Sequence, residues 1–270
     1  MSPSNPILTR AQAARIRNLI REKRARQTDG AFIVEGAKPV RDLLLTHPDE
    51  ILMLVTTSVF LRRESEQDRL IRESAGVPCY GCPDRTFVSL SDLETPQGVL
   101  AVVKKPRWNE QEIFDRAALL GLYGEGLQDP ANVGAIIRTA AALNADALWL
   151  TPESADVYNP KVVRAASGVL LTLPVFVAPD ATTFTERGCA IFTAEAGGAG
   201  TLAMDRIRTI PPRLILALGN ESRGLSTRTT GLAACRFTIP LDRQVESLNV
   251  AATAAIALYT LRSLPRKPLT

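Results

Sequence analysis

Three polar loops, each directly after an apolar strand-like run, hold the side chains that could do chemistry in this sequence. They lie in the stretches GEGLQDPANVGAIIRTA, LALGNESRGLS and IPLDRQVESLNVAATAA. Ligands of open parallel sheets bind beyond the carboxyl ends of the strands, so three such loops predict one shared site. The only histidine is His47, which argues against a histidine-based triad or a histidine-rich metal site. The candidate catalytic residues are Asn132, Arg138, Glu221, Ser247 and Asn249.

Each of these residues also has a structural explanation when it is taken alone. Asn132 or Ser247 could serve only to cap a helix. Arg138 lies on an otherwise apolar helix, where a solvent-facing or ion-paired arginine is unremarkable. The loop that follows Gly219 could be an ordinary turn. The structural explanations are easier to accept singly than jointly, so the three loops together favour a functional site.

The stretch GLYGEGLQD offers a competing interpretation as a nucleotide-binding glycine loop, with Glu153 after the next strand as a ribose ligand. The chain would then be a Rossmann dehydrogenase or a Rossmann-type methyltransferase. However, Asp129 occupies the place of the third glycine, and Asp129 and Pro130 suit the cap and first turn of a helix. This interpretation also leaves the other two loops unexplained, and it ranks second.

The composition is that of an ordinary water-soluble protein. The 270 residues are 46% hydrophobic and 22% charged, and neither a membrane span nor a signal peptide is recognisable, so a cytoplasmic location is expected. Cys79 and Cys82 form a C-x-x-C without a second pair, and Cys189 and Cys235 stand apart. We therefore expect free thiols and no metal.

The positive charge is concentrated near the start of the chain. The net charge is +4. The segment from Arg10 to Arg26 holds seven basic residues and one acidic residue, a local charge of +6, so the remainder is slightly acidic. Such a segment is either a solvated helix face or a binding surface for a polyanion such as RNA. The candidate RNA-binding residues are Arg10, Arg15, Arg17, Arg21, Lys23, Arg24, Arg26 and Lys38.

Strand and helix patterns alternate along the chain, which predicts an α/β fold with two domains. The expected domains are residues 1–104 and 118–270, joined by a polar linker at 105–117. In the first domain we expect strands at 31–36, 51–57, 77–82 and 98–104, and helices at 37–47, 59–75 and 87–93. In the second we expect strands at 118–124, 147–151, 174–178, 190–196, 213–219 and 236–241, and helices at 132–145, 159–171 and 247–264.

The three loop sequences resemble, in order and spacing, the motifs of the SpoU (TrmH) branch of the SPOUT RNA 2′-O-methyltransferases. The resembling stretches are DPANVGAIIRTAAAL, LALGNESRGLS and IPLDRQVESLNVAATAAIALY, and the similarity extends from about Leu119 to Leu261. The earlier stretch AFIVEGAKPVRDLL resembles the ribosomal-protein-like substrate-binding domain that precedes this core in the family's ribosomal RNA methylases. Ala131 departs from the pattern, because family members often have a larger or charged residue there.

The resemblance implies a SPOUT α/β domain with a deep trefoil knot, preceded by a smaller α/β RNA-binding domain. It also implies a homodimer formed across the C-terminal helix and the knot. S-adenosylmethionine would lie bent in the knot, and no metal is implied. Gly219 would let the backbone approach the cofactor closely, where a side chain would block it. The implied cofactor-binding residues are Thr193, Ala194, Leu218, Gly219, Asn220, Ile239, Ser247 and Leu248.

The resemblance also implies roles for the candidate catalytic residues. Glu221 would orient the site through Arg138 supplied across the dimer, while Asn132 and Asn249 would fix the ribose and the third loop. The family proposal makes Arg138 the base, but a guanidinium with a pKa above about 12 is a poor base. We expect Arg138 to grip the phosphate beside the target ribose.

The implied reaction is methyl transfer from S-adenosylmethionine to a ribose 2′-hydroxyl in RNA. Ribosomal RNA, with the large subunit favoured, is the expected substrate, and transfer RNA is the alternative within the same chemistry. A rival of another class is a non-catalytic RNA-binding factor for ribosome assembly that keeps the fold.

Overall fold

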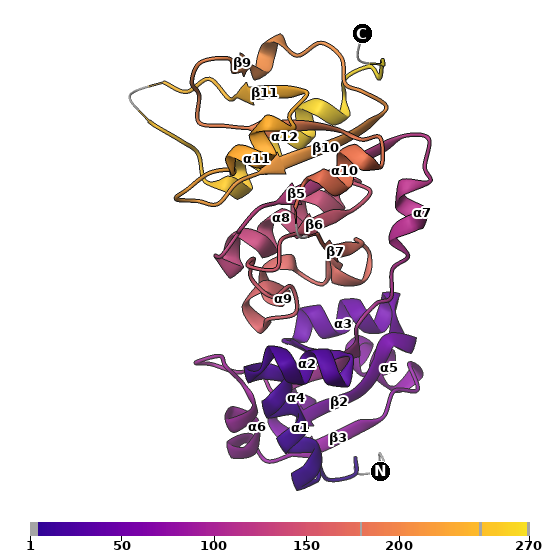
Figure 1. The fold of residues 1–270 in the computed structure, drawn as a ribbon. Helices are drawn as coiled ribbons and strands as arrows, with labels where there is room; N and C mark the ends of the chain where they lie inside the picture. Colours follow the sequence, from indigo (N-terminus) through magenta and orange to yellow (C-terminus); the bar gives the residue numbers. More distant parts are fainter. Residues whose placement is uncertain (1–4, 179, 243–244, 269–270) are drawn as a thin grey trace. The chain divides into compact units, whose positions relative to one another are not determined.

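The computed structural model describes residues 5–178, 180–242 and 245–268, and the chain divides into two compact units. The first unit comprises Met1–Pro106 and Asp156–Leu171, and the second comprises Arg107–Ala155 and Thr172–Thr270 (Figure 1). The chain therefore passes from one unit to the other three times. Strands and helices alternate in both units, so the predicted α/β class is confirmed.

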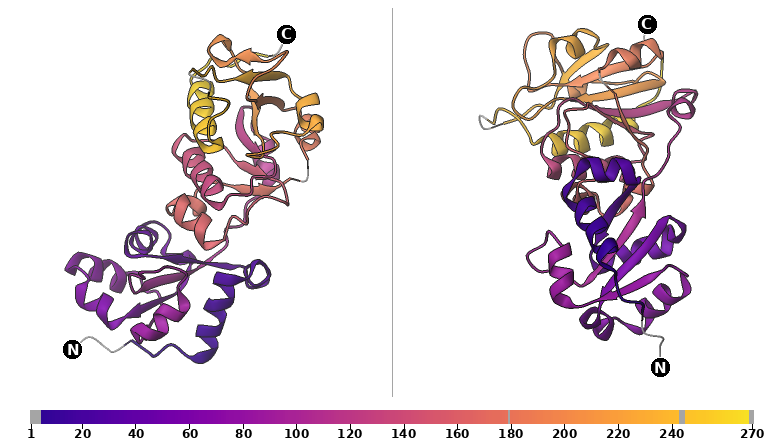
Figure 2. Two further views of the ribbon diagram at one scale, coloured as in Figure 1. Left: turned by 90° about the vertical axis from the view of Figure 1, so that its left-hand side faces the viewer. Right: turned by 60° about the horizontal axis from the view of Figure 1, so that its bottom comes forward.

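A four-stranded mixed sheet with the order β1-β4-β2-β3 forms the centre of the first unit. β4 (Val99–Lys104) pairs antiparallel with both β1 (Ala31–Glu35) and β2 (Ile51–Thr57), and β2 pairs parallel with β3 (Cys79–Cys82). Consecutive residues of β1 and β4 are buried, which is the pattern of strands whose two faces are both covered. Figure 2 shows helices on either side of this sheet.

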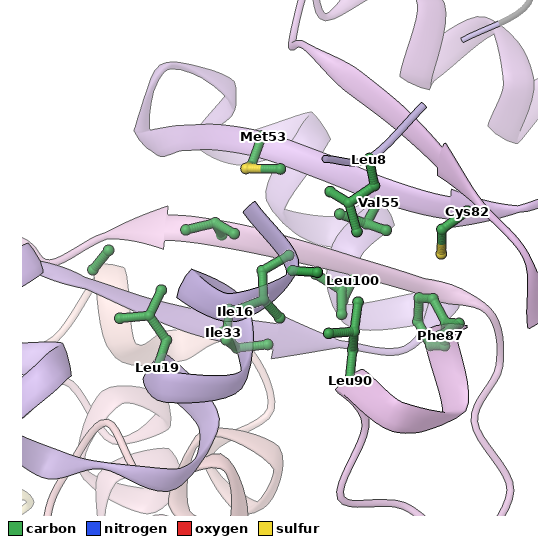
Figure 3. Close-up of a cluster of buried hydrophobic side chains, with 13 residues drawn as sticks. Leu8, Ile16, Leu19, Ile33, Met53, Val55, Cys82, Phe87, Leu90 and Leu100 are labelled. Atoms are coloured by element: carbon green, nitrogen blue, oxygen red, sulfur yellow. The ribbon is translucent and has the colours of Figure 1, made fainter. Parts of the chain in front are cut away.

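One face of this sheet packs on α1 (Arg10–Arg21) and α6 (Asp84–Leu90). Every second strand residue points into this core, as the two-residue period of a strand requires. Figure 3 shows these apolar side chains gathered between the strands and the two helices. The labelled members of the cluster are Leu8, Ile16, Leu19, Ile33, Met53, Val55, Cys82, Phe87, Leu90 and Leu100.

The other helices of the N-terminal region follow β1 and β2. They are α3 (Ala37–Thr46), α4 (Ser58–Arg63) and α5 (Glu66–Ser74), with a short 3-10 helix at Pro48–Glu50. The single helix predicted over 59–75 is wrong, because the chain is extended at Glu64 and Ser65. The Ser65 hydroxyl accepts the backbone N–H of Asp68 at 3.1 Å and so starts a second helix.

The basic segment forms two helices rather than one, because Glu22 is extended between α1 and α2 (Lys23–Asp29). Arg26 is only 2% exposed. Its guanidinium donates to the carboxylate of Asp156 at 2.6 and 2.8 Å and to the carbonyls of Leu19 and Ile20 at 2.7 and 3.1 Å. The prediction that Arg26 binds RNA is therefore corrected, because its charge and donors are used inside the first unit.

A seven-stranded sheet with the order β7-β6-β5-β10-β8-β11-β9 forms the centre of the second unit, and all its strands are parallel. The direction in which strands are added to the sheet reverses after β7. β8 does not lie beside β7 but on the other side of β5, next to β10. The strands are β5 (Leu119–Gly124), β6 (Leu148–Leu150), β7 (Val175–Val177), β8 (Ala190–Ala194), β9 (Leu202–Ala203), β10 (Arg213–Leu218) and β11 (Cys235–Thr238).

The long helices α8 (Pro130–Ala142) and α12 (Val250–Arg262) pack against each other, and α12 also packs on β10. In a separate core around Trp149, aromatic side chains come from α7 (Glu110–Phe114) and α10 (Thr182–Glu186) and from strands β5 and β7. The remaining helix of this unit is α11 (Thr227–Gly231), and a 3-10 helix spans Met204–Arg206. α9 (Pro160–Ala166) and the 3-10 helix Val169–Leu171 belong to the first unit.

Two segments belong to other units of the structure than the predicted domain boundaries imply. The expected linker, 105–117, contains α7, whose Ile113 and Phe114 are buried in the core of the second unit. The segment Asp156–Leu171, expected within the second domain, belongs to the first unit. The aromatic ring of Tyr158 there lies 5.0 Å from the ring of Phe32.

We predict that Arg26→Ala lowers the free energy of unfolding of the first unit by about 3 kcal/mol, because it removes the ion-pair partner of Asp156 and the donor to the carbonyls of Leu19 and Ile20. Arg15→Ala is the matched control. Its ion pair with Asp29 at 2.6 Å is partly exposed and should contribute less than about 1 kcal/mol. Urea unfolding of both variants measures the difference, and equal losses would contradict it.

Candidate active site

A cavity of about 710 Å³ opens in the second unit at the carboxyl ends of β8, β10 and β11. β10 lies between β5 and β8, so the strand order reverses beside the cavity. A reversal of this kind leaves a crevice beyond the strand ends, which is where open α/β sheets bind ligands. The predicted site residues that line the cavity are Ala194, Leu218, Gly219, Asn220, Glu221, Ile239, Ser247, Leu248 and Asn249.

Asn132 joins the three predicted loops through its side-chain amide. It lies in the first turn of α8, is 7% exposed, and donates from Nδ2 to Glu221 Oε1 at 2.9 Å. Its Oδ1 accepts from Asn249 Nδ2 at 2.8 Å. Asn249 in turn caps α12 by accepting the N–H of Ala251 at 2.8 Å. Asn249, rather than Ser247, is thus the cap of the last helix.

Gly219 is required by its own loop. A Cβ added there would lie 2.3 Å from the carbonyl carbon of Gly224 and 2.4 Å from the nitrogen of Leu225. The loop closes this tightly because Asn220 and Gly224 exchange two backbone hydrogen bonds, at 3.0 and 2.9 Å. The close return of the backbone at this turn is thus a local reason for glycine here, beside the predicted approach of a cofactor to a residue that also lines the cavity.

Asn220 organises the same loop. Its Oδ1 accepts the N–H groups of Ser222 and Arg223 at 3.0 and 3.1 Å, and its Nδ2 donates to the carbonyl of Gly126 at 2.6 Å. The side chain therefore ties the second loop to the first. It sits in the cavity wall with its polar atoms already paired, so its contribution to ligand binding comes through the shape of the loop.

Thr193 is fully buried and is absent from the cavity wall, whereas its neighbour Glu195 lines the wall. The Thr193 hydroxyl donates to Glu195 at 2.7 Å, and Arg236 forms a bidentate ion pair with the same carboxylate, with a shortest distance of 2.6 Å. The hydrogen bond from Arg236 lowers the pKa of Glu195, and partial burial opposes this less strongly. Glu195 is thus a fixed anion at the edge of the cavity.

Glu221 is also held as an anion. Burial raises the pKa of its carboxyl, but hydrogen bonds from the Asn132 amide and from the backbone N–H groups of Glu221, Asp129 and Gln128 lower it further, so that the net shift is downward. Asp129 caps α8 by accepting the N–H of Ala131 at 2.9 Å, and Pro130 follows as the first helical residue, as predicted. The start of α8 therefore supports the Glu221 carboxylate.

Arg138 lies away from the cavity of its own chain. It follows Asn132 by six positions on α8, which places the two side chains about 120° apart around the helix axis and about 9 Å apart along it. Arg138 is exposed, and within the described residues it makes no ion pair with Glu221 or with another carboxylate. Ser247 is exposed in the cavity wall.

Most of the predicted RNA-binding residues have solvent access. Arg15 is committed to its pair with Asp29, and Arg26 is buried as described above. Arg17 is half-buried. The exposed members of the set are Arg10, Arg21, Lys23, Arg24 and Lys38.

Within residues 5–178, 180–242 and 245–268, no group of three or more His, Cys, Asp or Glu side chains is arranged to hold a metal ion. Cys79, Cys82, Cys189 and Cys235 are all free thiols. Burial raises the pKa of Cys82 to about 11, which makes it an unreactive thiol at neutral pH. Among the same described residues, no helix has the length and apolar character to cross a membrane.

Comparison with known families decides the identity of the fold. Residues 120–259, which hold the cavity and all three loops, match the SpoU rRNA Methylase family. The chain belongs to the SpoU rRNA methylase family. Residues 14–101 match the MRM3-like substrate binding domain. The family resemblance of the motifs and the two-part organisation of this SpoU methylase are confirmed.

Two relatives of known activity cover nearly the whole SpoU methylase. The 23S rRNA (uridine(2479)-2′-O)-methyltransferase of Streptomyces viridochromogenes is 32% identical over 250 residues, which is 88% of this chain and 84% of that protein. The 23S rRNA (guanosine(2553)-2′-O)-methyltransferase RlmP of Bacillus subtilis is 29% identical over 245 residues, or 89% and 92% of the two chains. The structure of AviRb from S. viridochromogenes with AdoMet has a TM-score of 0.81 at 26% identity, covering 93% of this chain and 97% of that one.

In this SpoU methylase the glycine loop of the Rossmann interpretation makes hydrogen bonds within the protein. The N–H groups of Gly126 and Leu127 donate to the hydroxyls of Thr151 and Ser154, at 2.9 and 3.1 Å, so they do not form a phosphate cradle. The loop contributes no residue to the wall of the cavity. The Rossmann interpretation is therefore wrong.

Three charged residues in the wall of the SpoU cavity were not predicted, namely Glu195, Arg223 and Glu246. A signal for Glu195 was present, because it follows an apolar run directly, but we assigned it to the interior of a strand over 190–196. β8 in fact ends at Ala194, so Glu195 occupies the first position beyond the strand. Its partner Arg236 comes from β11, and no local pattern connects the two.

We predict that Gly219→Ala abolishes binding of S-adenosylmethionine and lowers the melting temperature, because the new Cβ collides with backbone that cannot move without opening the loop. Gly224→Ala is the matched control. Gly224 has φ +68°, and a Cβ added there would meet no atom within 4 Å, so alanine should cost only about 1–2 kcal/mol. Calorimetric titration and thermal unfolding compare the pair, and the idea fails if both variants bind equally.

We predict that Glu195→Gln destabilises the second unit most near neutral pH. The folded-state pKa of Glu195 is depressed, so its stabilisation is present above the unfolded value of 4.5 and is lost as pH falls through the folded-state pKa. The stability difference from wild type should therefore shrink below pH 4.5. Urea unfolding at a series of pH values measures it, with the exposed Glu186→Gln as control; a gap that does not change with pH contradicts the prediction.

Proposed function

We propose that this SpoU methylase transfers the methyl group of S-adenosylmethionine to a ribose 2′-hydroxyl of 23S ribosomal RNA. The observation that carries the proposal is the junction of three loops at Asn132 beside a cavity at the switch point of the sheet. The 23S rRNA 2′-O-methyltransferases that are 32% and 29% identical to this chain support the substrate.

The charge of the cavity wall suits S-adenosylmethionine. The cofactor carries a sulfonium, an ammonium and a carboxylate, so its net charge is positive. The carboxylates of Glu195, Glu221 and Glu246 in the wall complement that charge, and Arg223 offers a partner for the cofactor carboxylate. Seven of the eight residues that we assign to cofactor binding line the cavity, and Thr193 acts behind Glu195. When bound, the cofactor supplies a methyl group activated by the sulfonium.

The catalytic residues would act mainly by positioning. Sulfonium is an excellent leaving group, so the reaction depends chiefly on alignment of the 2′-hydroxyl and on removal of its proton. Asn132, Glu221 and Asn249 hold the loops in place, and Ser247 offers in the cavity wall a hydroxyl that has no hydrogen-bond partner among the described residues. We assign the target ribose to the face of the cavity between Glu221 and Ser247.

Arg138 would complete the site of a second subunit in a homodimer. Its exposed side chain points away from the cavity of its own chain, so it can contact RNA bound there only from a partner. An exposed stripe on α12, formed by Ala252, Ile256 and Tyr259 at helical spacing, supports pairing through the C-terminal helix. There Arg138 would bind the phosphate next to the target ribose. We further propose the trefoil knot for residues 118–270, which the similarity to AviRb supports.

The first unit would recruit the RNA. Its match to the MRM3-like substrate binding domain and the exposed basic residues of α1 and α2 support this role. Contacts between cationic side chains and phosphates position an RNA without reading its sequence.

The test of the proposed function is methyl transfer from labelled S-adenosylmethionine to unmodified transcripts of 23S rRNA, 16S rRNA and transfer RNA. Mass spectrometry of nuclease digests then identifies the methylated nucleoside. The proposal expects one 2′-O-methylnucleoside in 23S rRNA alone. Methylation of transfer RNA instead would correct the substrate, and cofactor binding without transfer to any RNA would favour the assembly factor.

We predict that Arg138→Ala lowers methyl transfer at least 100-fold and leaves binding of S-adenosylmethionine within about two-fold. Loss of a phosphate contact made only with bound RNA affects the reaction and not the cofactor. Mixed dimers of Arg138→Ala with Ser247→Ala should recover activity, because one site then contains both wild-type residues. Mixed dimers as inactive as the two parents would show that Arg138 acts within its own chain.

A further inference from the structure

A second cavity, of about 300 Å³, lies within the first unit and has no part in the site described above. It is enclosed by α3, α4 and α5 and by the start of β4. Its apolar wall is formed by Val40, Leu44, Phe60, Ile71 and Val99. Protein interiors are close-packed, so a cleft of this size in a small domain is a candidate for a ligand.

A buried ion pair contributes the polar part of the wall. The side chain of Glu64 is 4% exposed and accepts from Arg72 Nε at 3.1 Å and from Arg72 Nη2 at 2.9 Å. A carboxylate has about four acceptor positions, and among the described residues Arg72 is its only hydrogen-bond donor to these oxygens. Glu64 therefore keeps acceptor capacity for an N–H group of a ligand in the cavity.

Arginine side chains border the same cavity. Arg41 Nε lies 2.6 Å from Asp68 Oδ1, but the alignment does not make a hydrogen bond, and this buried Nε has no other acceptor among the described residues. Arg63 is exposed in the cavity wall and Lys38 is exposed one turn before Arg41. The wall thus combines three guanidinium groups with the carboxylates of Glu64 and Asp68, which leaves a net charge of +1, and Lys38 adds a further positive charge nearby.

The position of Phe60 is fixed by the backbone around it. Thr57 caps α4 by accepting the N–H of Phe60 at 3.1 Å. Gly98, at φ +82°, approaches so closely that a Cβ there would lie 2.6 Å from Thr57 Oγ1 and 3.2 Å from Phe60 Cβ. The backbone and Cβ of Phe60 are therefore closely packed, and its side chain lines the cavity.

We propose that this cavity receives one unstacked nucleobase of the RNA that the enzyme methylates. The inference rests on the proposed function. Proteins recognise splayed RNA bases by stacking them on aromatic rings and guanidinium planes and by hydrogen bonds to their edges. Phe60 and Arg41 provide the stacking groups, and Glu64 accepts an N–H from the base edge.

Size and charge favour a base of RNA as the occupant. The volume lies at the lower end of the range for small-molecule sites, about 300–1,000 Å³, and suits a single planar ring system. Arg63 and Lys38 can bind the phosphates on either side of the base. All the cavity residues fall between residues 14 and 101, the region that matches a substrate-binding domain.

The experiment measures binding of full-length protein to an unmodified 23S rRNA transcript without cofactor, at about 150 mM salt to limit non-specific phosphate contacts. Phe60→Ala removes the stacking ring, and Ala37→Trp fills the mouth of the cavity from the exposed first turn of α3. Each should weaken binding about 5- to 100-fold, the range for loss of one stacked base. Val88→Trp, at a 58% exposed position on α6, adds the same indole away from the cavity and should leave binding unchanged.

Photocrosslinking with a transcript containing 4-thiouridine and 6-thioguanosine adds a direct readout, and crosslinked peptides should include α4 or α5. If Phe60→Ala does not fold, Ala37→Trp decides. Wild-type affinity in a folded cavity variant, an equal loss in Val88→Trp, or crosslinks confined to other segments would each overturn the proposal. Because this binding assay contains no cofactor, its result does not depend on methyl transfer. Absence of transfer in the separate assay with labelled S-adenosylmethionine would refute the proposed function and leave the result for the cavity intact.

Discussion

The site depends on the two hydrogen bonds of the Asn132 side-chain amide, one to Glu221 and one from Asn249. The Glu221 carboxylate can only accept hydrogen bonds, so the amide nitrogen of Asn132 must face it, and the amide oxygen is then left for Asn249. Donors run in one direction, from the backbone of Ala251 through Asn249 and Asn132 to the Glu221 carboxylate. Hydrogen bonds in such a chain polarise one another, which favours a single arrangement of the loops.

This constraint explains why the cavity can keep its shape with few rigid elements around it. Its wall is formed largely by loops, and loops are held in place by side-chain contacts rather than by a ladder of backbone bonds. Asn220 fixes the second loop to Gly126, and Asn132 fixes it to both long helices. Glu195, locked by Arg236, adds a stationary charge on the other side. The cavity therefore has a pre-arranged negative surface, which is the condition for electrostatic preorganisation toward the cationic cofactor proposed to bind there.

Local sequence patterns were sufficient to predict most of the helices and strands and to identify the family. Nearly all strands and the long helices lie within three residues of the predicted ranges, because each has a clear apolar period. The break at Ser65 and the five-residue helices were missed, since a cap or a single turn alters the period little. Local patterns could not predict the burial of Arg26 or the pairing of Glu195 with Arg236, because each depends on a partner at least 41 positions away in the chain.

The return of Asp156–Leu171 to the first unit has a consequence for synthesis of the protein. A ribosome releases the chain from the N-terminus, and domains generally fold as units while they emerge. The first unit cannot pair Arg26 with Asp156, or pack Phe32 on Tyr158, until the first two strands of the second unit have also been made. Its completion must wait for more than half of the chain, so the boundary at Pro106 is not a point at which folding can finish.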